Sequence, residues 1–144
     1  MAVKPIPDGY HTVTPYLVVP DVAAELAFLE RAFGAEITFK MEGPDGSVSH
    51  AEARIGSSMV MLGRASEKWT PMPCMLYLYV EDTDAAYARA VEAGGESIME
   101  PADQFYGDRN GGVKDAYGNQ WWIGTHVEDL TPEEMARRAA AAGK

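Results

Sequence analysis

The feature that most constrains this chain is an internal repeat. An ungapped alignment at an offset of 61 residues places Val19–Ile37, VPDVAAELAFLERAFGAEI, over Val80–Ile98, VEDTDAAYARAVEAGGESI. A second alignment, in the same order and at an offset of 62, places Arg54–Gly63, RIGSSMVMLG, over Ala116–Thr125, AYGNQWWIGT. Two matches in one order at nearly one offset indicate two copies of a unit of about 60 residues.

Each copy begins with a strand that leads into a helix. Alternating apolar residues predict the strands Thr12–Val19 and Cys74–Val80. Asp21 and Asp82 then stand where the N-cap of a helix is expected. In the first copy, apolar residues recur at helical spacing over Val22–Phe33. The glycines that predict the ends of the two helices are Gly34, Gly94 and Gly95.

Three short strands complete each copy. The predicted strands are Glu36–Met41, Val48–Ile55 and Ser58–Leu62, then Ser97–Glu100, Gly111–Lys114 and Gln120–Thr125. A βαβββ unit carries its helix on one sheet face and leaves the other face open. We therefore predict an α+β fold in which two such units curve around a shared, barrel-like cleft.

The domain boundaries follow from the repeat. A single domain is predicted over residues 1–127, with the repeats at about 10–64 and 73–127. Residues 128–144 form a C-terminal helical tail, in which Thr131 is the expected N-cap and Pro132 the first helical residue.

Strand alternation predicts which side chains of the first copy face the cleft. Leu17 and Val19 pack under the helix, so Tyr16 faces the cleft. On the strand SVSHAEARIG the small apolar residues form the core, and the residues predicted to face the cleft are His50, Glu52 and Arg54. His50 and Glu52 are either an acid–base pair or hydrogen-bonded neighbours on a sheet.

The same alternation applies to the second copy. Tyr77 and Tyr79 are predicted to face the cleft. Trp121 and Trp122 are adjacent, so one of them must enter the core and the other must face the cleft. The repeat alignment pairs Trp122 with Val60 and assigns both to the cleft, which leaves Trp121 in the core. The predicted cleft is therefore largely aromatic and suits planar or cationic ligands.

A glycine-rich segment, DQFYGDRNGG, precedes one of the last strands. We interpret Asp103–Gly112 as a loop whose Phe105 and Tyr106 cover the mouth of the pocket. Arg109 would bind a carboxylate or steady an oxyanion there. The alternative is an ordinary turn with a buried aromatic anchor. The segment lacks the GK[ST] signature of a phosphate-binding loop.

Charge and cysteine content limit the partners and the compartment. The formal net charge is −10, which disfavours nucleic acid and suits a neutral or cationic small molecule. Cys74 is the single cysteine, so an intrachain disulfide is impossible. The N-terminal residues lack the apolar stretch of a signal peptide, and no apolar run is long enough to span a membrane. We expect a cytoplasmic protein with no membrane partner.

Three features carry a family resemblance: the paired βαβββ pattern, the Val-x-Asp ends of both first strands, and the turn DAYGNQWW. Together they resemble the vicinal oxygen chelate superfamily over about residues 10–127. The segment MEPADQFYGDRNGGVKDAYGNQWWIGTHVED is most similar to its PhnB-like, glyoxalase/bleomycin-resistance-related branch. The resemblance implies the fold but not one activity, because this scaffold carries many chemistries.

Metalloenzymes of that superfamily take ligands, usually His or Glu, from the first and last strand of each repeat. The positions in this chain to which the resemblance assigns these ligands are Thr14, Val60, Met75 and Trp122. None of these four side chains suits a divalent metal. We therefore predict no metal at that site and no cofactor.

The resemblance and the aromatic cleft leave three functions open. The first is a metal-independent protein that binds an aromatic or cationic small molecule, such as an antibiotic, and forms a homodimer. The second is a glyoxalase-like lyase or isomerase that uses His50 and Glu52 for acid–base chemistry. The third is a structural or regulatory module with a vestigial cleft. Whether the protein is an enzyme is therefore left open.

Overall fold

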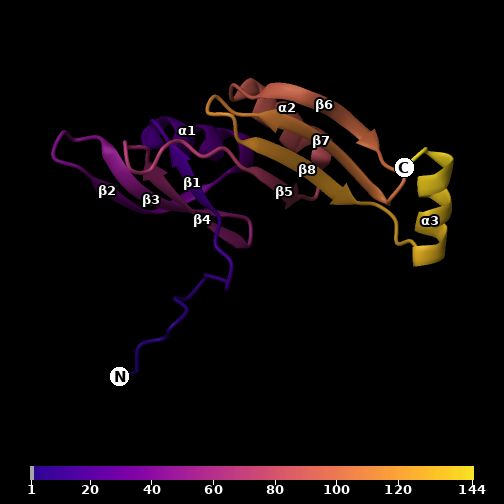
Figure 1. Cartoon of the computed structure of the whole chain (residues 1–144), viewed down its shortest axis with the longest axis horizontal. Helices are drawn as coiled ribbons and strands as arrows, with labels where there is room; N and C mark the ends of the chain where they lie inside the picture. Colours follow the sequence, from indigo (N-terminus) through magenta and orange to yellow (C-terminus); the bar gives the residue numbers. More distant parts are fainter. Residues whose placement is uncertain (1) are drawn as a thin grey trace. The chain divides into compact units, whose positions relative to one another are not determined.

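The computed structural model describes residues 2–144, and the chain divides into two compact units, Met1–Cys74 and Met75–Lys144. The elements of the first unit are β1 (Tyr16–Val19), α1 (Val22–Phe33), β2 (Glu36–Glu42), β3 (Val48–Ile55) and β4 (Ser58–Arg64). The strand order is β1-β4-β3-β2, in which β1 and β4 are parallel and the other pairs are antiparallel (Figure 1).

The second unit repeats this arrangement. Its elements are β5 (Met75–Tyr79), α2 (Thr83–Glu92), β6 (Glu96–Asp103), β7 (Asp108–Lys114) and β8 (Gln120–His126), followed by α3 (Pro132–Ala141). The strand order is β5-β8-β7-β6, with β5 and β8 parallel. The predicted α+β fold, two βαβββ units with a C-terminal helix, is confirmed. Within residues 2–144, no helix has both the length and the apolar character needed to cross a membrane.

The predicted helix N-caps are present in all three helices. The carboxylates of Asp21 and Asp82 accept hydrogen bonds from backbone N–H groups at 3.0 and 3.1 Å, and the Thr131 hydroxyl accepts one at 3.1 Å. Gly34 caps α1 with a φ of 65°, a left-handed conformation that glycine adopts without strain. Helix α2 ends at Glu92 and has Ala93 as its C-cap, one residue before the predicted glycines.

Each sheet is covered by a helix on one face only. In the first unit α1 packs on β3 and β4, and Leu17, Leu26 and Leu29 are almost completely buried between helix and sheet. In the second unit α2 packs on β6, β7 and β8. We call the face opposite the helix the open face of each sheet. Side chains on the open faces are the candidates for ligand contacts, because no helix covers them.

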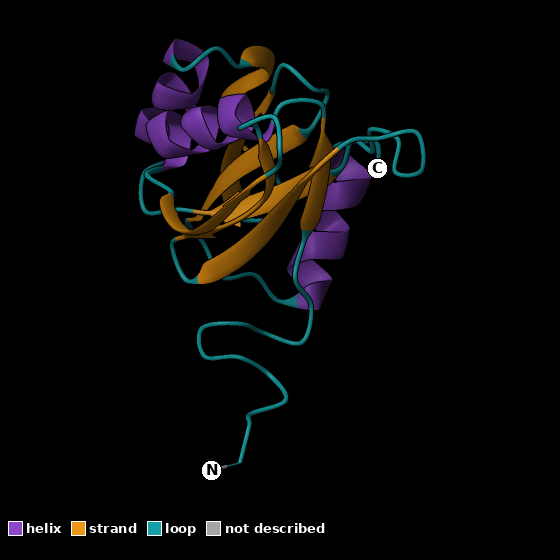
Figure 2. Cartoon of the chain, turned by 90° about the vertical axis from the view of Figure 1, so that its left-hand side faces the viewer, coloured by secondary structure: helices purple, strands orange, loops and turns teal. Residues whose placement is uncertain are grey.

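Strand β1 is shorter than predicted. It starts at Tyr16 instead of Thr12, because Pro15 has no backbone N–H with which to extend the ladder. Thr14 consequently lies before the strand, and residues 2–15 form an irregular segment without helix or strand (Figure 2).

The interpretation of Asp103–Gly112 as a glycine-rich loop is wrong for its second half. Strand β7 starts at Asp108, and only residues 104–107 form a turn. The two glycines are strand residues that allow close packing. A Cβ at Gly111 would lie 3.0 Å from backbone atoms of β6, and a Cβ at Gly112 would lie 2.9 Å from the ring of Trp122.

The assignment of Val60 to the cleft side is also wrong. Val60 is 3% exposed and pairs with the fully buried Ala53, so it faces α1. The residue that corresponds to Trp122 is Met61, because Met61 pairs with Tyr16 as Trp122 pairs with Tyr77. The error arose from aligning turn glycines in hairpins of different length. The β3–β4 turn comprises residues 56–57, whereas the β7–β8 turn comprises residues 115–119.

Candidate functional site

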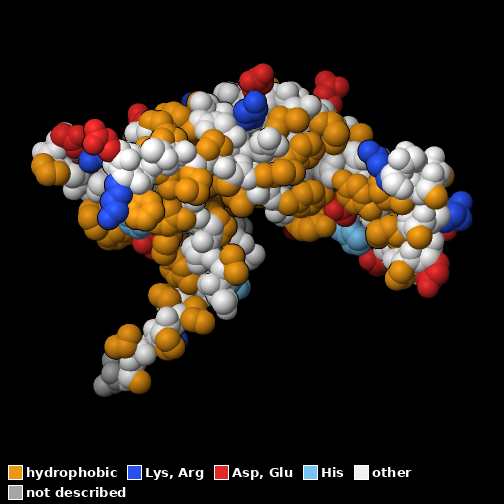
Figure 3. Space-filling view, viewed as in Figure 1, with side chains coloured by type: hydrophobic (Ala, Val, Ile, Leu, Met, Phe, Trp, Pro, Cys, Tyr) orange, Lys and Arg blue, Asp and Glu red, His pale blue; other side chains and the backbone are white. Residues whose placement is uncertain are grey.

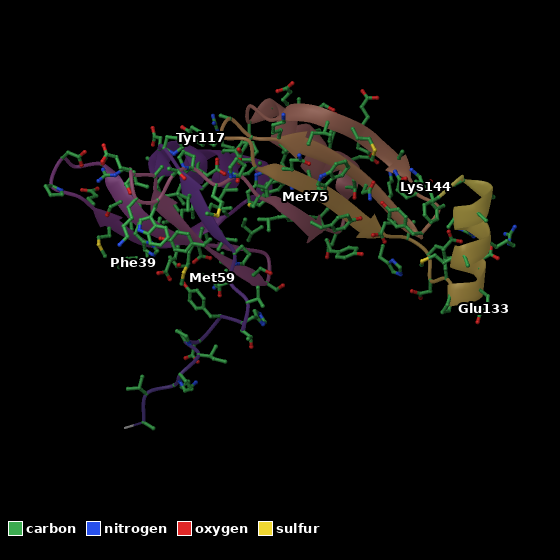
Figure 4. All side chains as sticks on the ribbon, viewed as in Figure 1. Phe39, Met59, Met75, Tyr117, Glu133 and Lys144 are labelled. Atoms are coloured by element: carbon green, nitrogen blue, oxygen red, sulfur yellow. The ribbon has the colours of Figure 1, made fainter. Side chains whose placement is uncertain are left out.

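The open face of the second sheet exposes a row of large side chains on β5. Met75, Tyr77 and Tyr79 are 63%, 41% and 66% exposed (Met75 is labelled in Figure 4). The rings of Tyr77 and Tyr79 lie 5.2 Å apart at an interplanar angle of 58°. Figure 3 shows hydrophobic side chains gathered over the strands of this unit, with a histidine and acidic atoms beside them.

The adjacent tryptophans lie on opposite faces of β8, as the alternation predicts. Trp121 is fully buried, and its Nε1–H donates to Asp115 Oδ2 at 2.9 Å. Trp122 lies on the open face, partly exposed, with its ring against the backbone of Gly112. Its Nε1–H donates to Gln120 Oε1 at 3.1 Å. Trp122 therefore presents one face of its indole ring to the outside of the sheet.

The turn DAYGN between β7 and β8 has a structural role. The buried carboxylate of Asp115 accepts hydrogen bonds from the backbone N–H groups of Tyr117 and Asn119 at 2.9 and 3.0 Å (Tyr117 is labelled in Figure 4). The same carboxylate accepts the Trp121 bond. Asp115 thus fixes both the turn and the tryptophan that fills the core behind the open face.

A nearly buried carboxylate lies under the exposed tyrosines. Asp108 is 5% exposed, and its Oδ2 accepts hydrogen bonds from the hydroxyls of Tyr77 and Tyr79 at 2.8 and 2.9 Å. Its Oδ1 lies 3.0 Å from His126 Nδ1, and His126 Nε2 lies 2.7 Å from Asp129 Oδ1. The sequence analysis did not identify this network. The pairing of Asp108 with His126 across β7 and β8 could have revealed it, but that pairing follows only once the start of β7 is known.

The network changes the acidity of its members. Burial, and then the bond to Asp108, raise the pKa of Tyr77 well above its ordinary value, against an opposing hydrogen bond from Asn110. The bond to Asp108, and then burial, raise the pKa of Tyr79. Burial acts to raise the pKa of Asp108, but the bonds from His126 and the two tyrosines outweigh it, so that pKa is lowered. The bonds to Asp108 and then Asp129 raise the pKa of His126. Asp108 is therefore an anion at neutral pH.

Asn110 joins the tyrosine network to the turn before β7. Its side chain is 2% exposed, and its Nδ2 donates to the hydroxyls of Tyr77 at 3.0 Å and Tyr106 at 2.6 Å. The rings of Phe105 and Tyr106 meet edge to face at 5.1 Å. Tyr106 thus lies beside Tyr77, as a loop residue that contributes to the open face.

Arg109 is not brought together with these aromatic residues. Its neighbours along β7, Asp108 and Asn110, join the open-face network, and alternation turns Arg109 toward α2. Its guanidinium pairs with Asp84 at 2.9 Å and with Asp103 at 3.3 Å. The Arg109 guanidinium, which was expected to bind the carboxylate of a ligand, is therefore already paired with two carboxylates of the protein.

The open face of the first sheet carries a chain of hydrogen-bonding side chains. Tyr16 Oη lies 3.3 Å from His50 Nδ1, and His50 Nε2 lies 3.1 Å from Glu52 Oε2. The hydroxyl of Tyr10, from the irregular N-terminal segment, donates to the other oxygen of Glu52. The structure therefore brings together the predicted residues Tyr16, His50 and Glu52. Arg54 pairs instead with Glu36.

A groove of about 610 Å³ lies beside Tyr16 in the first unit. The residues that line it are Tyr16, Val18, Ser49, Gly63, Arg64, Trp69 and Met72. The last two come from the segment after β4, where the Met72 N–H donates to the carbonyl of Val18 at 3.2 Å. The groove is thus mainly aromatic and apolar, with Arg64 at its polar side.

The two open faces share one construction. Tyr16 lies over Gly63 and Tyr77 lies over Gly124, so a Cβ at either glycine would meet the tyrosine hydroxyl at 2.5 or 2.4 Å. Each tyrosine hydroxyl then contacts the residue that pairs with its glycine. This residue is His50 in the first unit and Asn110 in the second.

The positions at which the superfamily holds a metal do not fit one here. With the corrected register they are Thr14, Met61, Met75 and Trp122, which offer a hydroxyl, two thioethers and an indole. Divalent metals prefer imidazole, carboxylate and thiolate. Elsewhere in residues 2–144, no three His, Cys, Asp or Glu side chains are arranged to share a metal.

Comparison with known proteins identifies the family. Residues 10–123 match the model of the Glyoxalase/Bleomycin resistance protein/Dioxygenase superfamily. The chain therefore belongs to this superfamily, the vicinal oxygen chelate proteins, and is a glyoxalase/bleomycin-resistance-type protein. It is 33% identical to the uncharacterised protein Rv0887c of Mycobacterium tuberculosis, over 91% of this chain and 84% of that protein.

Solved structures show the same fold. TioX from Micromonospora sp. ML1 is similar with a TM-score of 0.71 and 24% identity, over 81% of this chain and 99% of that chain. A PhnB protein from Bacillus cereus is similar with a TM-score of 0.64 and 20% identity, over 80% and 99% of the two chains. At these identities the similarity concerns the fold alone.

Proposed function

We propose that this protein binds a small molecule without a metal and holds an aromatic or cationic ligand on the open face of the second sheet. The observation that carries this proposal is the exposure of Tyr77, Tyr79 and Trp122 around the nearly buried carboxylate of Asp108. Exposed aromatic side chains beside a buried anion are typical of a binding surface rather than of a solvated one.

The chemistry of this face favours a ring system or a cation. Stacking and cation–π contacts contribute about 0.5–2 kcal/mol each. The negative charge of Asp108 lies next to the tyrosine rings and adds to their attraction for a cation. The net charge of −10 attracts cationic molecules to the protein over a longer range.

A cationic antibiotic is the first ligand class to test. The superfamily description includes bleomycin resistance proteins, and bleomycin combines aromatic rings with a positive charge. Sequestration needs neither a metal nor turnover, which agrees with the poor ligand set at Thr14, Met61, Met75 and Trp122. Stoichiometric Zn²⁺, Ni²⁺ or Mn²⁺ in the purified protein would contradict this part of the proposal.

The test is a calorimetric titration of bleomycin into the wild-type protein and into Trp122→Ala. Loss of the indole should weaken binding by about 1–3 kcal/mol, roughly 5- to 150-fold. Tyr87→Phe is the matched control, because Tyr87 lies on α2, away from the open face, and donates to Ser97. Equal affinities for wild type and Trp122→Ala would place the ligand elsewhere.

A second candidate function is catalysis by a lyase or isomerase of the glyoxalase type. The observation that favours it is the 3.1 Å contact between His50 and Glu52 on the open face of the first sheet. An imidazole held by a carboxylate is suited to proton transfer. A glyoxalase-type assay of wild type and Glu52→Gln tests this candidate. The wild-type protein should turn over the substrate, and Glu52→Gln should do so more slowly.

We also propose that the protein forms a homodimer. Helix α3, fully within the described residues, buries none of its side chains in the single chain, and Met135 is 37% exposed on it. An amphipathic helix without an intramolecular core is suited to contact a second copy. Sedimentation equilibrium of the full chain and of a chain ending at residue 130 measures this. The shorter chain should form the weaker dimer, so it should become monomeric at a higher protein concentration than the full chain.

A further inference from the structure

We propose that Tyr16, His50 and Glu52 form a proton relay in which the Tyr16 oxygen is a general base. Its substrate would be a small apolar or aromatic molecule in the adjacent groove that carries an acidic proton, such as a C–H beside a carbonyl. This inference is independent of ligand binding by the second unit. It deepens the second candidate function, because it assigns roles to His50 and Glu52 and adds Tyr16 as the residue that meets the substrate.

The direction of the hydrogen bonds follows from the chemistry of the three groups. An ionised carboxylate only accepts, so the His50 nitrogen that faces Glu52, Nε2, carries the proton. In a neutral imidazole the other nitrogen, Nδ1, is then an acceptor. The Tyr16 hydroxyl must therefore donate to Nδ1, and its oxygen keeps its lone pairs for a partner in the groove.

Glu52 is held in place for this role. The Tyr10 hydroxyl donates to one carboxylate oxygen, and His50 contacts the other. The side chains of His50 and Glu52 are 23% and 22% exposed, so their interaction is only partly screened by water. A carboxylate that contacts one ring nitrogen orients the imidazole, which is the role of the third group beside a catalytic base. Glu52 thus holds the His50 ring with Nδ1 toward the Tyr16 hydroxyl.

The proposed step balances without a metal or an oxidant. The ligand X–H bond breaks as an O–H bond forms at the Tyr16 oxygen, and the original hydroxyl proton of Tyr16 moves to His50 Nδ1. The products are the conjugate base of the ligand, neutral Tyr16 and an imidazolium paired with Glu52. The hydroxyl proton moves to an imidazole held by a carboxylate, as in a serine–histidine–aspartate triad, but the Tyr16 oxygen takes up a proton where the serine oxygen would attack a carbonyl carbon.

Tyr16 is placed to meet a ligand. Its ring lies over Gly63 and lines the groove of about 610 Å³, and the residue is 48% exposed. Arg64 lines the same groove and uses Nη1 for Asp45 and the Ser47 hydroxyl. The guanidinium carries five N–H donors, so donors remain for the oxyanion of a deprotonated carbonyl compound.

The second unit contains a built-in control for this relay. Tyr77 occupies the equivalent position over Gly124, but its polar neighbour is the amide of Asn110. Its hydroxyl donates to the carboxylate of Asp108, and burial, followed by this bond, raises the pKa of Tyr77. The acceptor of the Tyr77 proton is therefore a carboxylate with a lowered pKa, which is a weaker base than an imidazole, so Tyr77 should react more slowly than Tyr16.

The test is acetylation by N-acetylimidazole, followed by peptide mass spectrometry of the full chain. In this reaction the tyrosine oxygen bonds to the acetyl carbon, imidazole leaves, and the phenolic proton is taken by the base. Tyr16, Tyr77 and Tyr79 are 48%, 41% and 66% exposed, so access alone would make Tyr79 react fastest and Tyr16 and Tyr77 react at similar rates. We expect Tyr16 to react at least about tenfold faster than the other two, a modest part of the usual effect of a positioned base.

Two variants separate the relay from simple exposure. His50→Asn gives the first unit the residue of the second, and it should lower the rate at Tyr16 to that at Tyr77. Glu52→Gln keeps the shape of the side chain but removes the charge, and it should also slow Tyr16. If His50→Asn does not fold, Glu52→Gln decides.

Equal rates at Tyr16 and Tyr77 in the wild type would overturn the proposal, as would unchanged rates at Tyr16 in the folded variants. Bleomycin binding and its loss in Trp122→Ala concern the second unit. The binding function and the relay can therefore fail separately.

Discussion

The two units place the same pair of residues, a tyrosine over a glycine, at the same point of an open sheet face. Around Tyr16 the polar groups are an imidazole and a carboxylate in series, whereas around Tyr77 they are an amide and a nearly buried carboxylate. The backbone construction is thus shared and the chemistry differs. In the proposed relay the first unit moves a proton, whereas the second unit holds its tyrosine protons beside a fixed negative charge.

The helix-covered sides differ in a compensating way. Helix α1 buries the large side chains Leu26 and Leu29, whereas α2 buries mainly Ala86 and Ala90. In the second unit a fully buried Trp121 from the sheet fills the volume that the alanines leave. Close packing requires this exchange of large and small residues between layers.

The largest expected effect therefore comes from Trp121→Ala. It removes the main core side chain of the second unit and leaves Asp115 Oδ2 without its indole donor. We expect a loss of about 3–5 kcal/mol in the free energy of unfolding, measured by urea denaturation. Trp122→Ala, on the open face, should cost less than about 1.5 kcal/mol. The reverse order would mean that the strand register is shifted by one residue.

The next effect concerns the two glycines under the tyrosines. Gly63→Ala and Gly124→Ala each force a tyrosine ring away from its strand, because the new Cβ would lie within 3 Å of the ring. We expect a cost of about 1–3 kcal/mol for each in urea denaturation. Similar costs in the two units would confirm the shared construction. If one of the two substitutions left the free energy of unfolding unchanged and the other lowered it, the two units would not share this construction.

The smallest effect is a pH dependence confined to the second unit. The pKa of His126 is raised, so its contribution to stability is complete below the ordinary value of 6.5 and is lost as pH rises through the raised pKa. The pKa of Asp108 is lowered, so its contribution is complete above the ordinary value of 3.8 and is lost as pH falls through the lowered pKa. The network should therefore contribute most to the stability of the fold between pH 3.8 and pH 6.5.

Urea midpoints of wild type and His126→Gln across this range measure the effect. The difference between them should be largest near pH 5–6 and shrink in alkaline solution as wild-type His126 loses its proton. A difference that stays constant through alkaline pH would show that the histidine acts without its charge.

Patterns of period two and 3.6 predicted much of the fold from the sequence. Alternation predicted the opposite faces of Trp121 and Trp122, and the residue type after each first strand predicted the N-caps Asp21 and Asp82. Each of these predictions depends only on neighbours along the chain. The prediction for Val60 was wrong because the register of a hairpin depends on the length of its turn. The two turns differ in length, so aligning their glycines shifted the register by one residue.

The site was harder to predict than the fold. Asp108 and His126 have residue types that are typical of a surface, and only the pairing of β7 with β8 brings them together under Tyr77. The separation of Arg109 from the aromatic face follows from the same pairing. Once β7 is known to begin at Asp108, alternation alone places Arg109 toward α2.

The central claim is that ligands bind the open face of the second sheet, against Trp122. It is tested most directly by following the indole N–H signals of ¹⁵N-labelled protein while bleomycin and a panel of cationic aromatic compounds are added. For every compound that binds, the signal of Trp122 should shift with saturation while the buried Trp121 signal stays in place. Binding that shifts Trp121 and leaves Trp122 unchanged would contradict the account.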